Sequence, residues 1–251
     1  LGQTPAFIGI QNYLDLLKDE RFINSVKVTL IYVVTSVPTK LIFALFVAYL
    51  LTQGRRGVTF YRSLYYVPSL IGGSIAVALV WKTIFSRKGL ANTILASLGL
   101  QKLSWLGDPK LSMGILVLMS AWQFGSSMII FAAGLKEIPG SYYEAAEIDG
   151  ANKWQRFLRI TLPCLSPIIL YNLVMQTITA FMAFTQAFVI TQGGPNDATN
   201  FYALYVYNHA FKWSNMGYAS AMSWLMLVLI SLITFILFKS SKFWVFSEAD
   251  Q

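Results

Sequence analysis

Residues 217–238 read GYASAMSWLMLVLISLITFILF, a run without a single charged side chain. About 20 apolar residues in a helix cross the hydrocarbon core of a bilayer, so this run predicts a membrane-spanning helix. Four further apolar blocks lie at residues 26–51, 64–85, 111–135 and 162–190. In lipid each block has to be helical, because a helix satisfies its own backbone N–H and C=O groups. The expected fold is an all-α, polytopic transmembrane helix bundle that forms a single domain over residues 1–251.

The composition favours a membrane protein over a soluble one. The chain has 251 residues, of which 56% are hydrophobic and 12% are charged, whereas soluble domains contain about 25% charged residues. We attribute the net charge of +8 to basic loops beside the membrane, because the basic residues form no stripe with interleaved aromatics that would predict a nucleic-acid partner. Cys164 is the only cysteine and no residues have metal-ligand spacing, so neither an internal disulfide nor a metal site is expected.

The polar segment between the third and fourth blocks, residues 139–161, is predicted to form a compact helix–Gly–helix element. A capping-box pattern at residues 141–144 predicts the start of its first helix. Gly150 is expected to end that helix in a left-handed conformation. Asn152 can cap a second, basic helix, and Pro163 marks the change to the next span. From its residues alone, the element could equally be an amphipathic hairpin that lies on the membrane surface.

The same segment carries a run of residues with a known spacing. The positions are Glu144, Ala145, Ala146, Asp149, Gly150 and Ala151, followed by Phe157, Ile160, Leu162 and Pro163. This run resembles the EAA loop of permease subunits of binding-protein-dependent ABC importers. The resemblance implies that the loop is cytoplasmic and docks on a separate ATP-hydrolysing subunit. It also implies that Glu144 contacts a basic group of that subunit, that Gly150 permits the turn, and that the C-terminus is cytoplasmic.

A second resemblance points to the carbohydrate-uptake branch of that family. It rests on residues 7–13, on TQGGP at residues 191–195 with residues 198–199, on Tyr207 and residues 210–211, and on residues 217–221. These segments are similar to the region after the first helix, to the external loop and to the last helix of that branch. Members of this type usually have at least one more span before this point, so a further helix is expected upstream of Leu1.

Together the two resemblances imply a permease subunit that forms half of the translocation pathway of a carbohydrate importer. The implied location is the cytoplasmic membrane of a bacterium or archaeon. The implied partners are a second permease of a different sequence, two ATP-binding-cassette ATPase subunits, an extracytoplasmic solute-binding protein and the lipid bilayer. The sequence has no G-x-x-x-x-G-K-[ST] phosphate loop, so ATP and Mg are expected on the partner ATPase. We expect no cofactor and no catalytic residue in this chain.

Polar and aromatic side chains of the third and fourth blocks are the candidates for the substrate pathway. They are Trp122, Gln123, Ser126, Asn172, Gln176, Thr179 and Phe184. The spacing of Asn172, Gln176 and Thr179 places them on one helical face. Amides in a membrane helix need partners, so this face is expected to point to the bundle interior or to a wet cavity. The alternative is that these amides only bridge helices.

Two other functions remain open from the residues alone, namely a stand-alone secondary carrier or channel and a scaffold that anchors a cytosolic protein. The blocks contain no Asp, Glu or His, and Lys40 is their clear intramembrane charge. Proton-coupled carriers usually need titratable acids inside the membrane, which argues against a carrier. We interpret Lys40 as structural, either paired inside the bundle or snorkelling, with a role in gating as the alternative.

Overall fold

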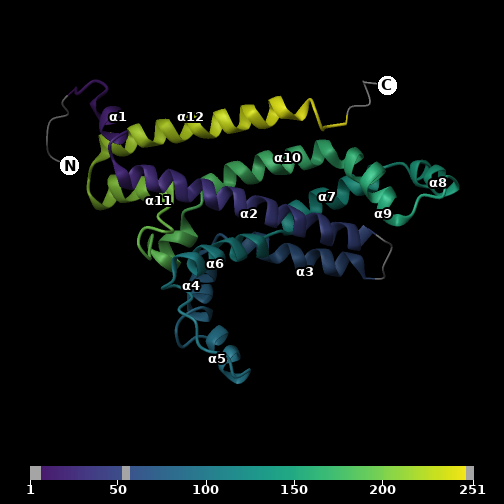
Figure 1. Cartoon of the computed structure of the whole chain (residues 1–251), viewed down its shortest axis with the longest axis horizontal. Coiled ribbons are helices and arrows are strands. Elements are labelled where there is room, and N and C mark those ends of the chain that lie inside the picture. The colour runs from purple at the N-terminus through teal and green to yellow at the C-terminus, as the bar shows by residue number, and fades with distance from the viewer. Residues whose placement is uncertain (1–6, 53–56, 247–251) are drawn as a thin grey trace. The chain divides into compact units, whose positions relative to one another are not determined.

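The computed structural model describes residues 7–52 and 57–246, and every regular element among them is a helix (Figure 1). The all-α fold expected from the sequence is therefore confirmed. In chain order the elements are α1 (Gln11–Leu16), α2 (Glu20–Thr52), α3 (Val58–Ile71), α4 (Ile75–Ile84), α5 (Leu90–Ser97), α6 (Pro109–Trp122), α7 (Gly125–Glu137), α8 (Gly140–Ile148), α9 (Lys153–Arg156), η1 (Phe157–Thr161), α10 (Leu162–Phe181), η2 (Ala187–Thr191), α11 (Tyr202–Tyr207), η3 (Asn208–Lys212) and α12 (Met216–Ser241), where η marks a π-helical turn.

Within the described residues, three helices are long and apolar enough to cross a membrane: Glu20–Thr52, Lys153–Phe181 and Met216–Ser241. Two helix pairs, α3 with α4 and α6 with α7, pass the same test together but are bent by more than 40° at a short break. The count rises to five if each bent pair is one span. The second and third apolar blocks are therefore each broken into two helices, whereas the sequence predicted one uninterrupted helix for each.

Local chemistry explains where these boundaries differ. The second block is interrupted after Ile71, where two glycines of low helix propensity precede Ser74. Ser74 then caps α4, because its Oγ accepts a hydrogen bond from the backbone N–H of Val77 at 3.3 Å. The fourth block ends its α-helix at Phe181 instead of residue 190, and the chain continues into η2.

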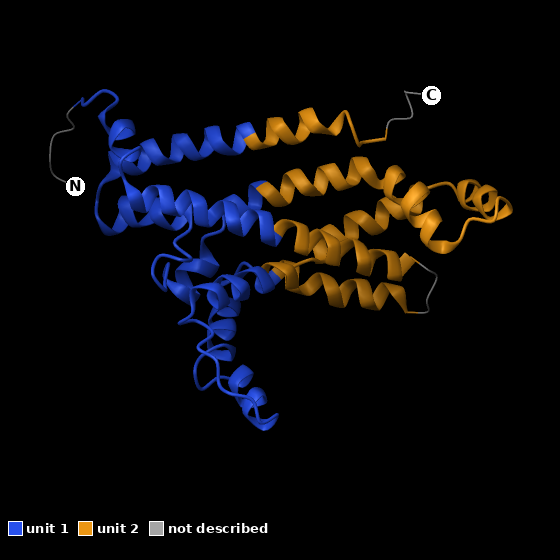
Figure 2. Ribbon diagram, in the orientation of Figure 1, with its two compact units in different colours: residues 1–36, 71–119, 178–232 blue, residues 37–70, 120–177, 233–251 orange. Residues whose placement is uncertain are grey.

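Figure 2 colours two compact units, each built from three stretches of the chain. Unit 1 comprises residues 1–36, 71–119 and 178–232, and unit 2 comprises residues 37–70, 120–177 and 233–251. The helices α2, α3, α6, α10 and α12 each contribute residues to both units. Sequence-distant stretches therefore meet inside each unit, which is the pattern of a helix bundle and not of consecutive domains.

In unit 2, one serine side chain replaces the backbone hydrogen bonds lost at the break between α6 and α7. The hydroxyl of Ser69 donates to the carbonyl oxygen of Gln123 at 3.0 Å and accepts from the N–H of Ser126 at 3.1 Å. This bridge requires close approach of α3 and α7. Gly125 permits it, because a Cβ at that position would collide with the carbonyl oxygen of Tyr65 and lie 2.7 Å from the Cα of Tyr66.

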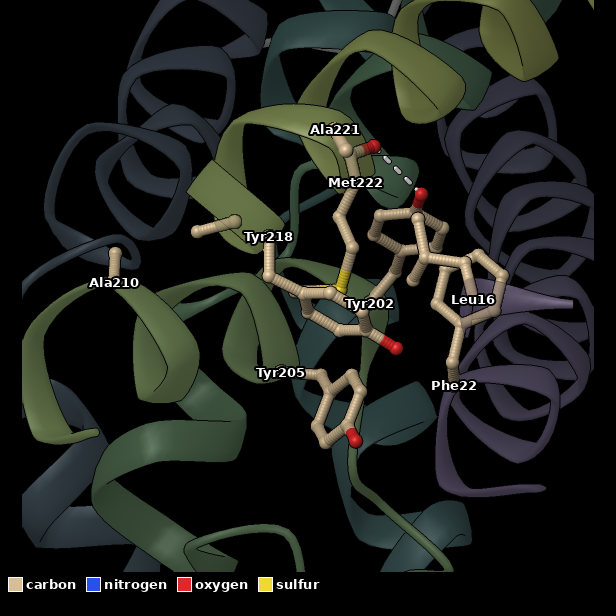
Figure 3. Close-up of a cluster of buried hydrophobic side chains, with 9 residues drawn as sticks. Leu16, Phe22, Tyr202, Tyr205, Ala210, Tyr218, Ala221 and Met222 are labelled. Atoms are coloured by element: carbon tan, nitrogen blue, oxygen red, sulfur yellow. Dashed lines mark hydrogen bonds between the residues drawn. The ribbon is translucent and has the colours of Figure 1, made fainter. Parts of the chain in front are cut away.

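Unit 1 contains a buried cluster that joins the N-terminal helices to α11, η3 and α12 (Figure 3). Its members are Leu16, Phe22, Tyr202, Tyr205, Ala210, Tyr218, Ala219, Ala221 and Met222. Tyr202 is central, since its ring packs edge-on against Phe22 at 5.4 Å and its hydroxyl donates to the carbonyl oxygen of Met222 at 2.7 Å. The backbone N–H of Tyr202 donates to Thr29 Oγ1 at 2.8 Å. These contacts fix α11 against α2 and α12.

The carboxylate of Asp19, just before α2, is the polar anchor of this cluster. Its Oδ2 accepts hydrogen bonds from the hydroxyls of Tyr205 at 2.8 Å and Tyr218 at 2.9 Å. Its Oδ1 accepts from the backbone N–H groups of Arg21 and Phe22. Burial is the largest influence on the pKa of Asp19 and acts to raise it, but these hydrogen bonds together outweigh burial and hold the pKa below its ordinary value.

The only histidine of the chain, His209, packs among the aromatic rings beside Asp19. Its ring centroid lies 4.6 Å from Tyr205, 4.6 Å from Trp213 and 4.7 Å from Tyr218. Both ring nitrogens are buried, and neither has a hydrogen-bond partner among the described residues. Burial lowers the pKa of His209 below its ordinary value, although the charge of Asp19 acts in the opposite direction.

We predict that Gly125→Ala destabilises the protein while Gly114→Ala does not. The added methyl group at 125 meets the rigid backbone of α3, and overpacking of this kind costs about 1–3 kcal/mol. Gly114 is also helical, but a Cβ there has open space, and alanine is the better helix former. Thermal unfolding of the detergent-purified variants measures the difference. Equal midpoints for both variants would contradict the close approach of α3 and α7.

We also predict that His209 makes the protein less stable in mild acid. The unfolded chain takes up a proton at this position as the pH falls through about 6.5, before the folded chain does. Stability therefore rises with pH in this window, is lost on acidification, and stops falling below the folded pKa. Asp19 stays charged throughout, because its pKa lies lower. Between about pH 7.5 and pH 5.5, the unfolding midpoint should fall less in His209→Phe than in the wild type, and parallel curves would refute the prediction.

Candidate functional site

The predicted helix–Gly–helix element is present, and we call residues 139–161 the coupling element. Its first helix, α8, begins at Gly140 with Pro139 as the N-cap, and no side chain caps it. The capping box predicted at residues 141–144 is therefore wrong. The physical reason is that the N-cap falls on Pro139, which places Ser141 inside the first turn, where its side chain no longer reaches the free N–H groups.

The turn after α8 is fixed by backbone hydrogen bonds. Gly150 has a φ of +77°, in the left-handed region, as predicted. The N–H of Gly150 donates to the carbonyl oxygen of Glu147 at 3.0 Å, and the N–H of Ala151 donates to that of Ala146 at 2.9 Å. This pair of bonds is the Schellman motif, which closes the end of a helix. The turn is therefore a defined joint.

The second half of the coupling element begins with a full capping box. Asn152 Oδ1 accepts from the N–H of Gln155, and Gln155 Oε1 accepts from the N–H of Asn152, both at 2.9 Å. The cap predicted at Asn152 is thus confirmed. From Lys153 the helix runs without a break through α9, η1 and α10 to Phe181. Pro163 therefore lies inside a continuous helix and does not mark its start as expected, so the coupling element is an extension of a candidate span.

Three further contacts hold the two halves of the coupling element together and to α2. Arg156 pairs with Glu147 at 3.1 Å, an exposed ion pair of small energetic value. The hydroxyls of Tyr143 and Thr161 share a hydrogen bond of 2.9 Å. Phe157 packs edge-on against Tyr49 of α2 with ring centroids 5.2 Å apart. A cavity of about 320 Å³ lies between these side chains.

The coupling element exposes large apolar side chains on an otherwise polar surface. Ile148 is 87% exposed and Trp154 is 66% exposed. The predicted docking residues Glu144, Ala145, Asp149 and Gly150 are exposed, while Ala146 and Ala151 are half-buried. Large exposed apolar side chains are often found at protein–protein contact surfaces. Sequence reasoning missed Ile148 and Trp154, although two large apolar residues in a polar loop were a visible signal.

The structure separates the predicted pathway residues into two groups. Trp122, Gln123, Ser126, Asn172 and Gln176 belong to unit 2, whereas Thr179 and Phe184 belong to unit 1. Gln123 and Ser126 are both bonded through their backbone to Ser69 at the break in the helix. The polar groups of the third block thus lie where the helix is interrupted.

Asn172 and Gln176 differ in their surroundings although they share a helical face. Asn172 is 1% exposed, its Nδ2 donates to the carbonyl oxygen of Ile168 at 3.2 Å, and its Oδ1 is buried without a partner among the described residues. Gln176 is half-buried and Thr179 is exposed. The amide of Asn172 is therefore committed to its own helix, and the accessible part of this face begins at Gln176.

Phe184 belongs to an aromatic group in unit 1. Its ring stacks on Phe188 with centroids 5.1 Å apart and an interplanar angle of 19°. Tyr207 of α11 packs against both rings, at 4.9 Å from Phe184 and 5.3 Å from Phe188. Sequence reasoning assigned only Phe184 of this group to the pathway, because Tyr207 is distant in sequence and reaches the group only through the fold.

Lys40 of α2 and Lys82 of α4 lie within apolar segments of their helices. Lys40 is 9% exposed and has no ion pair among the described residues. Lys82 of α4 lies inside the second apolar block and escaped the sequence reasoning; its ammonium donates to the carbonyl oxygen of Val189 at 3.0 Å. Lys82 therefore supports the irregular backbone of η2. In the part of the chain that the structure describes, no group of three or more His, Cys, Asp or Glu could hold a metal ion.

Comparison with curated proteins gives close relatives across the full chain. The "Probable ABC transporter permease protein YesP" of Bacillus subtilis (strain 168) is 52% identical and covers 100% of this chain and 82% of its own length. The "Multiple sugar-binding transport system permease protein MsmF" of Streptococcus mutans is 33% identical over 94% of this chain and 81% of its own. The "Trehalose/maltose transport system permease protein MalF" of Thermococcus litoralis is 34% identical over 94% of this chain and 80% of its own length.

Among solved structures, the fold matches a bacterial ABC transporter involved in the import of the acidic polysaccharide alginate. The TM-score is 0.85 at 24% identity, covering 95% of this chain and 85% of the other. The family model of the "Binding-protein-dependent transport system inner membrane component" matches residues 17–243. With its apolar helices, the chain is a multi-pass membrane protein. It belongs to the family of inner membrane components of binding-protein-dependent transport systems.

Proposed function

We propose that this chain forms half of the translocation pathway of an ATP-driven carbohydrate importer and is driven by a separate ATPase through the coupling element. The observation that supports this most directly is the rigid joint at Gly150, built into a helix that continues as a candidate span. Relatives named for sugar transport support a carbohydrate as the solute.

The coupling element is suited to transmit force because its shape is fixed on both sides of the turn. The Schellman motif closes α8 at Gly150, and the capping box at Asn152 opens the following helix. A load applied at α8 is therefore passed to α10 without being absorbed by a flexible loop. In this mechanism ATP closes the two motor subunits, the coupling element moves with its motor, and the spans change from inward-open to outward-open.

The proposed docking surface consists of Glu144, Ala145, Ala146, Asp149, Gly150 and Ala151, and we include the exposed side chains of Ile148 and Trp154 in it. The small side chains allow close approach of the ATPase, and the two large apolar side chains lose exposed area when it docks. Burying a side chain of this size contributes about 1.5–3 kcal/mol. Glu144 supplies a charge for a basic group of the partner.

The solute pathway is proposed to use accessible groups of the interrupted helices, namely Trp122, Gln123, Ser126, Gln176, Thr179 and Phe184. Amides and hydroxyls hydrogen-bond to sugar hydroxyls, and aromatic rings contact the C–H faces of a pyranose. Asn172 is buried, so we propose that it supports this surface without contacting the solute.

The complete importer would contain a second permease of different sequence, two ATPase subunits that bind ATP and Mg, and an extracytoplasmic solute-binding protein. The coupling element and the C-terminus would face the cytoplasm of a bacterium or archaeon. The alternative of a stand-alone carrier or channel is disfavoured by family membership, because the family depends on a binding protein.

We predict that Gly150→Pro uncouples ATP hydrolysis from uptake. Proline fixes φ near −65°, so it cannot adopt the left-handed conformation found here, and its ring removes the N–H that bonds to Glu147. Uptake by the reconstituted complex should fall about tenfold, because proline where φ is positive and the N–H is bonded destabilises by more than about 1 kcal/mol. The matched control is Gly150→Asn, since asparagine tolerates a positive φ and should retain most of the uptake. Normal uptake by the Gly150→Pro variant would refute the proposal that the turn at Gly150 transmits force.

Removing the apolar docking contacts should weaken assembly without affecting insertion. We expect the double variant Ile148→Ser with Trp154→Ser to lose co-purification of the ATPase, while Leu98→Ser, an exposed leucine in unit 1, keeps it. Detergent extraction and pull-down of the complex measure this. Retention of the ATPase by the double variant would exclude these side chains from the docking surface.

The source of energy can be tested directly. ATP-driven uptake into proteoliposomes should cease when the partner ATPase carries an inactivating substitution in its phosphate loop, because this chain has no such loop. Proteoliposomes that contain this chain alone serve as the comparison. Solute flux in them, driven by an ion gradient without any ATPase, would support the stand-alone carrier and refute the importer.

A further inference from the structure

A cavity in unit 1 lies beyond the residues that we assign to the pathway. Its volume is about 360 Å³, and its main lining residues are Phe188, Gln192, Tyr207, Asn208, Phe211 and Lys212. They come from η2, the residue that ends it, α11 and η3. Small-molecule sites have volumes of about 300–1,000 Å³, so the cavity has room for one sugar unit.

One side of this cavity is aromatic and accessible. Phe188 is 38% exposed and Phe211 is 67% exposed. The ring of Tyr207 lies between them, with its centroid 5.3 Å from Phe188 and 5.2 Å from Phe211. The face of an aromatic ring is electron-rich and attracts the weakly positive C–H groups of a pyranose. The three rings together therefore present a surface to which a sugar ring can stack.

The other side carries three polar groups that are not used inside the protein. Among the described residues, the amides of Gln192 and Asn208 have no side-chain hydrogen-bond partner, and the ammonium of Lys212 has no ion pair. An amide offers both donors and acceptors, which suits adjacent hydroxyls. An ammonium offers three donors and one positive charge, which suits a carboxylate.

The backbone at Gln192 is an independent sign that its side chain serves a purpose. Gln192 has a φ of +54° at the end of η2, and its N–H donates to the carbonyl oxygen of Ala187 at 2.7 Å. A left-handed conformation costs a residue other than glycine about 1–2 kcal/mol. Gly193 is also in the left-handed region, with a φ of +88°, so two consecutive residues adopt this conformation and the first of them is not glycine. Such conformations concentrate at functional sites.

Most of the residues that line the cavity belong to π-helical turns. Phe188 belongs to the π-helical turn η2, and Asn208, Phe211 and Lys212 belong to the π-helical turn η3. π-Helical turns are rare and occur frequently at functional sites. The cavity also adjoins the proposed pathway, because the ring of Phe184 stacks on Phe188 at 5.1 Å.

We propose that this cavity is an outer subsite for an anionic sugar unit, a pyranose that carries a carboxylate. The sugar ring stacks on Phe211 and Tyr207, the amides of Gln192 and Asn208 bind its hydroxyls, and Lys212 pairs with its carboxylate. A single ammonium matches the single negative charge of a uronate. This assignment rests on the proposed function and narrows its solute to carbohydrates with acidic units.

Binding to the complete importer complex in lipid nanodiscs tests the proposal. The probes are a uronate trisaccharide and its methyl ester, which keeps the rings but removes the charge. Binding is followed by the change in tryptophan fluorescence, to which Trp213 contributes because it is next to Lys212 in sequence. Lys212→Gln should weaken binding of the trisaccharide about tenfold, the effect of losing one charged hydrogen bond, and leave the ester unchanged. The matched control, Lys110→Gln, removes an exposed lysine of unit 1 that does not line the cavity and should leave both affinities unchanged.

Two further variants separate a binding role from a structural one. Phe211→Ala should weaken both the acid and the ester, because it removes the stacking surface. Gln192→Gly should weaken binding while raising the unfolding temperature, because glycine adopts the left-handed conformation without strain. A purely structural role for Gln192 would leave binding unchanged, and this outcome would overturn its assignment.

The outcomes distinguish this inference from the proposed function. Equal weakening of acid and ester by Lys212→Gln, or no weakening of either, overturns the subsite while ATP-driven uptake of carbohydrate stands. Equal weakening is also the result expected if Lys212 contacts a protein partner. Absence of ATP-driven uptake of every carbohydrate by the wild-type complex overturns the proposed function and the inference with it.

Discussion

The hydrocarbon layer of a bilayer contains no water to satisfy a free backbone N–H or C=O, and this constraint governs the fold. Where the helices are continuous, they meet it by themselves. Where they break, side chains supply the missing bonds: Ser69 bridges the break between α6 and α7, Ser74 caps α4, and Lys82 bonds to the irregular turn η2. These three polar residues of the apolar segments thus lie where the backbone is irregular.

The coupling element obeys a different constraint, because it lies in a segment too polar for lipid and must keep its shape without burial. Local hydrogen bonds provide most of the rigidity, at the Schellman turn of Gly150 and the capping box of Asn152. Packing of Phe157 against Tyr49 then attaches the element to α2. The exposed Ile148 and Trp154 cost little in the isolated chain and become favourable only when another protein covers them. The rigid shape and the exposed apolar side chains are the two features on which the proposed docking role rests.

In unit 1, aromatic residues have two roles: some anchor the N-terminal helices, and others line a cavity. Tyr205 and Tyr218 bind the carboxylate of Asp19 and enclose His209, so they anchor the N-terminal helices. Tyr207 packs between Phe188 and Phe211 and lines a cavity. The anchored side has its polar groups paired with one another, with the exception of the histidine nitrogens. On the open side, two amides and an ammonium have no side-chain partner among the described residues, which is why we propose ligand binding there.

The sequence by itself determined the helical class and the turn at Gly150, because long apolar runs and a glycine beside a capping residue act over a few neighbouring residues. It did not determine the break near residue 123, since the backbone groups freed there are bonded by Ser69, which another helix supplies. It placed Asn172, Gln176 and Thr179 on one face but could not show that Asn172 bonds to its own helix. The aromatic cavity was decided by tertiary structure alone, because its side chains come from turns whose π-helical geometry and mutual approach depend on packing between segments.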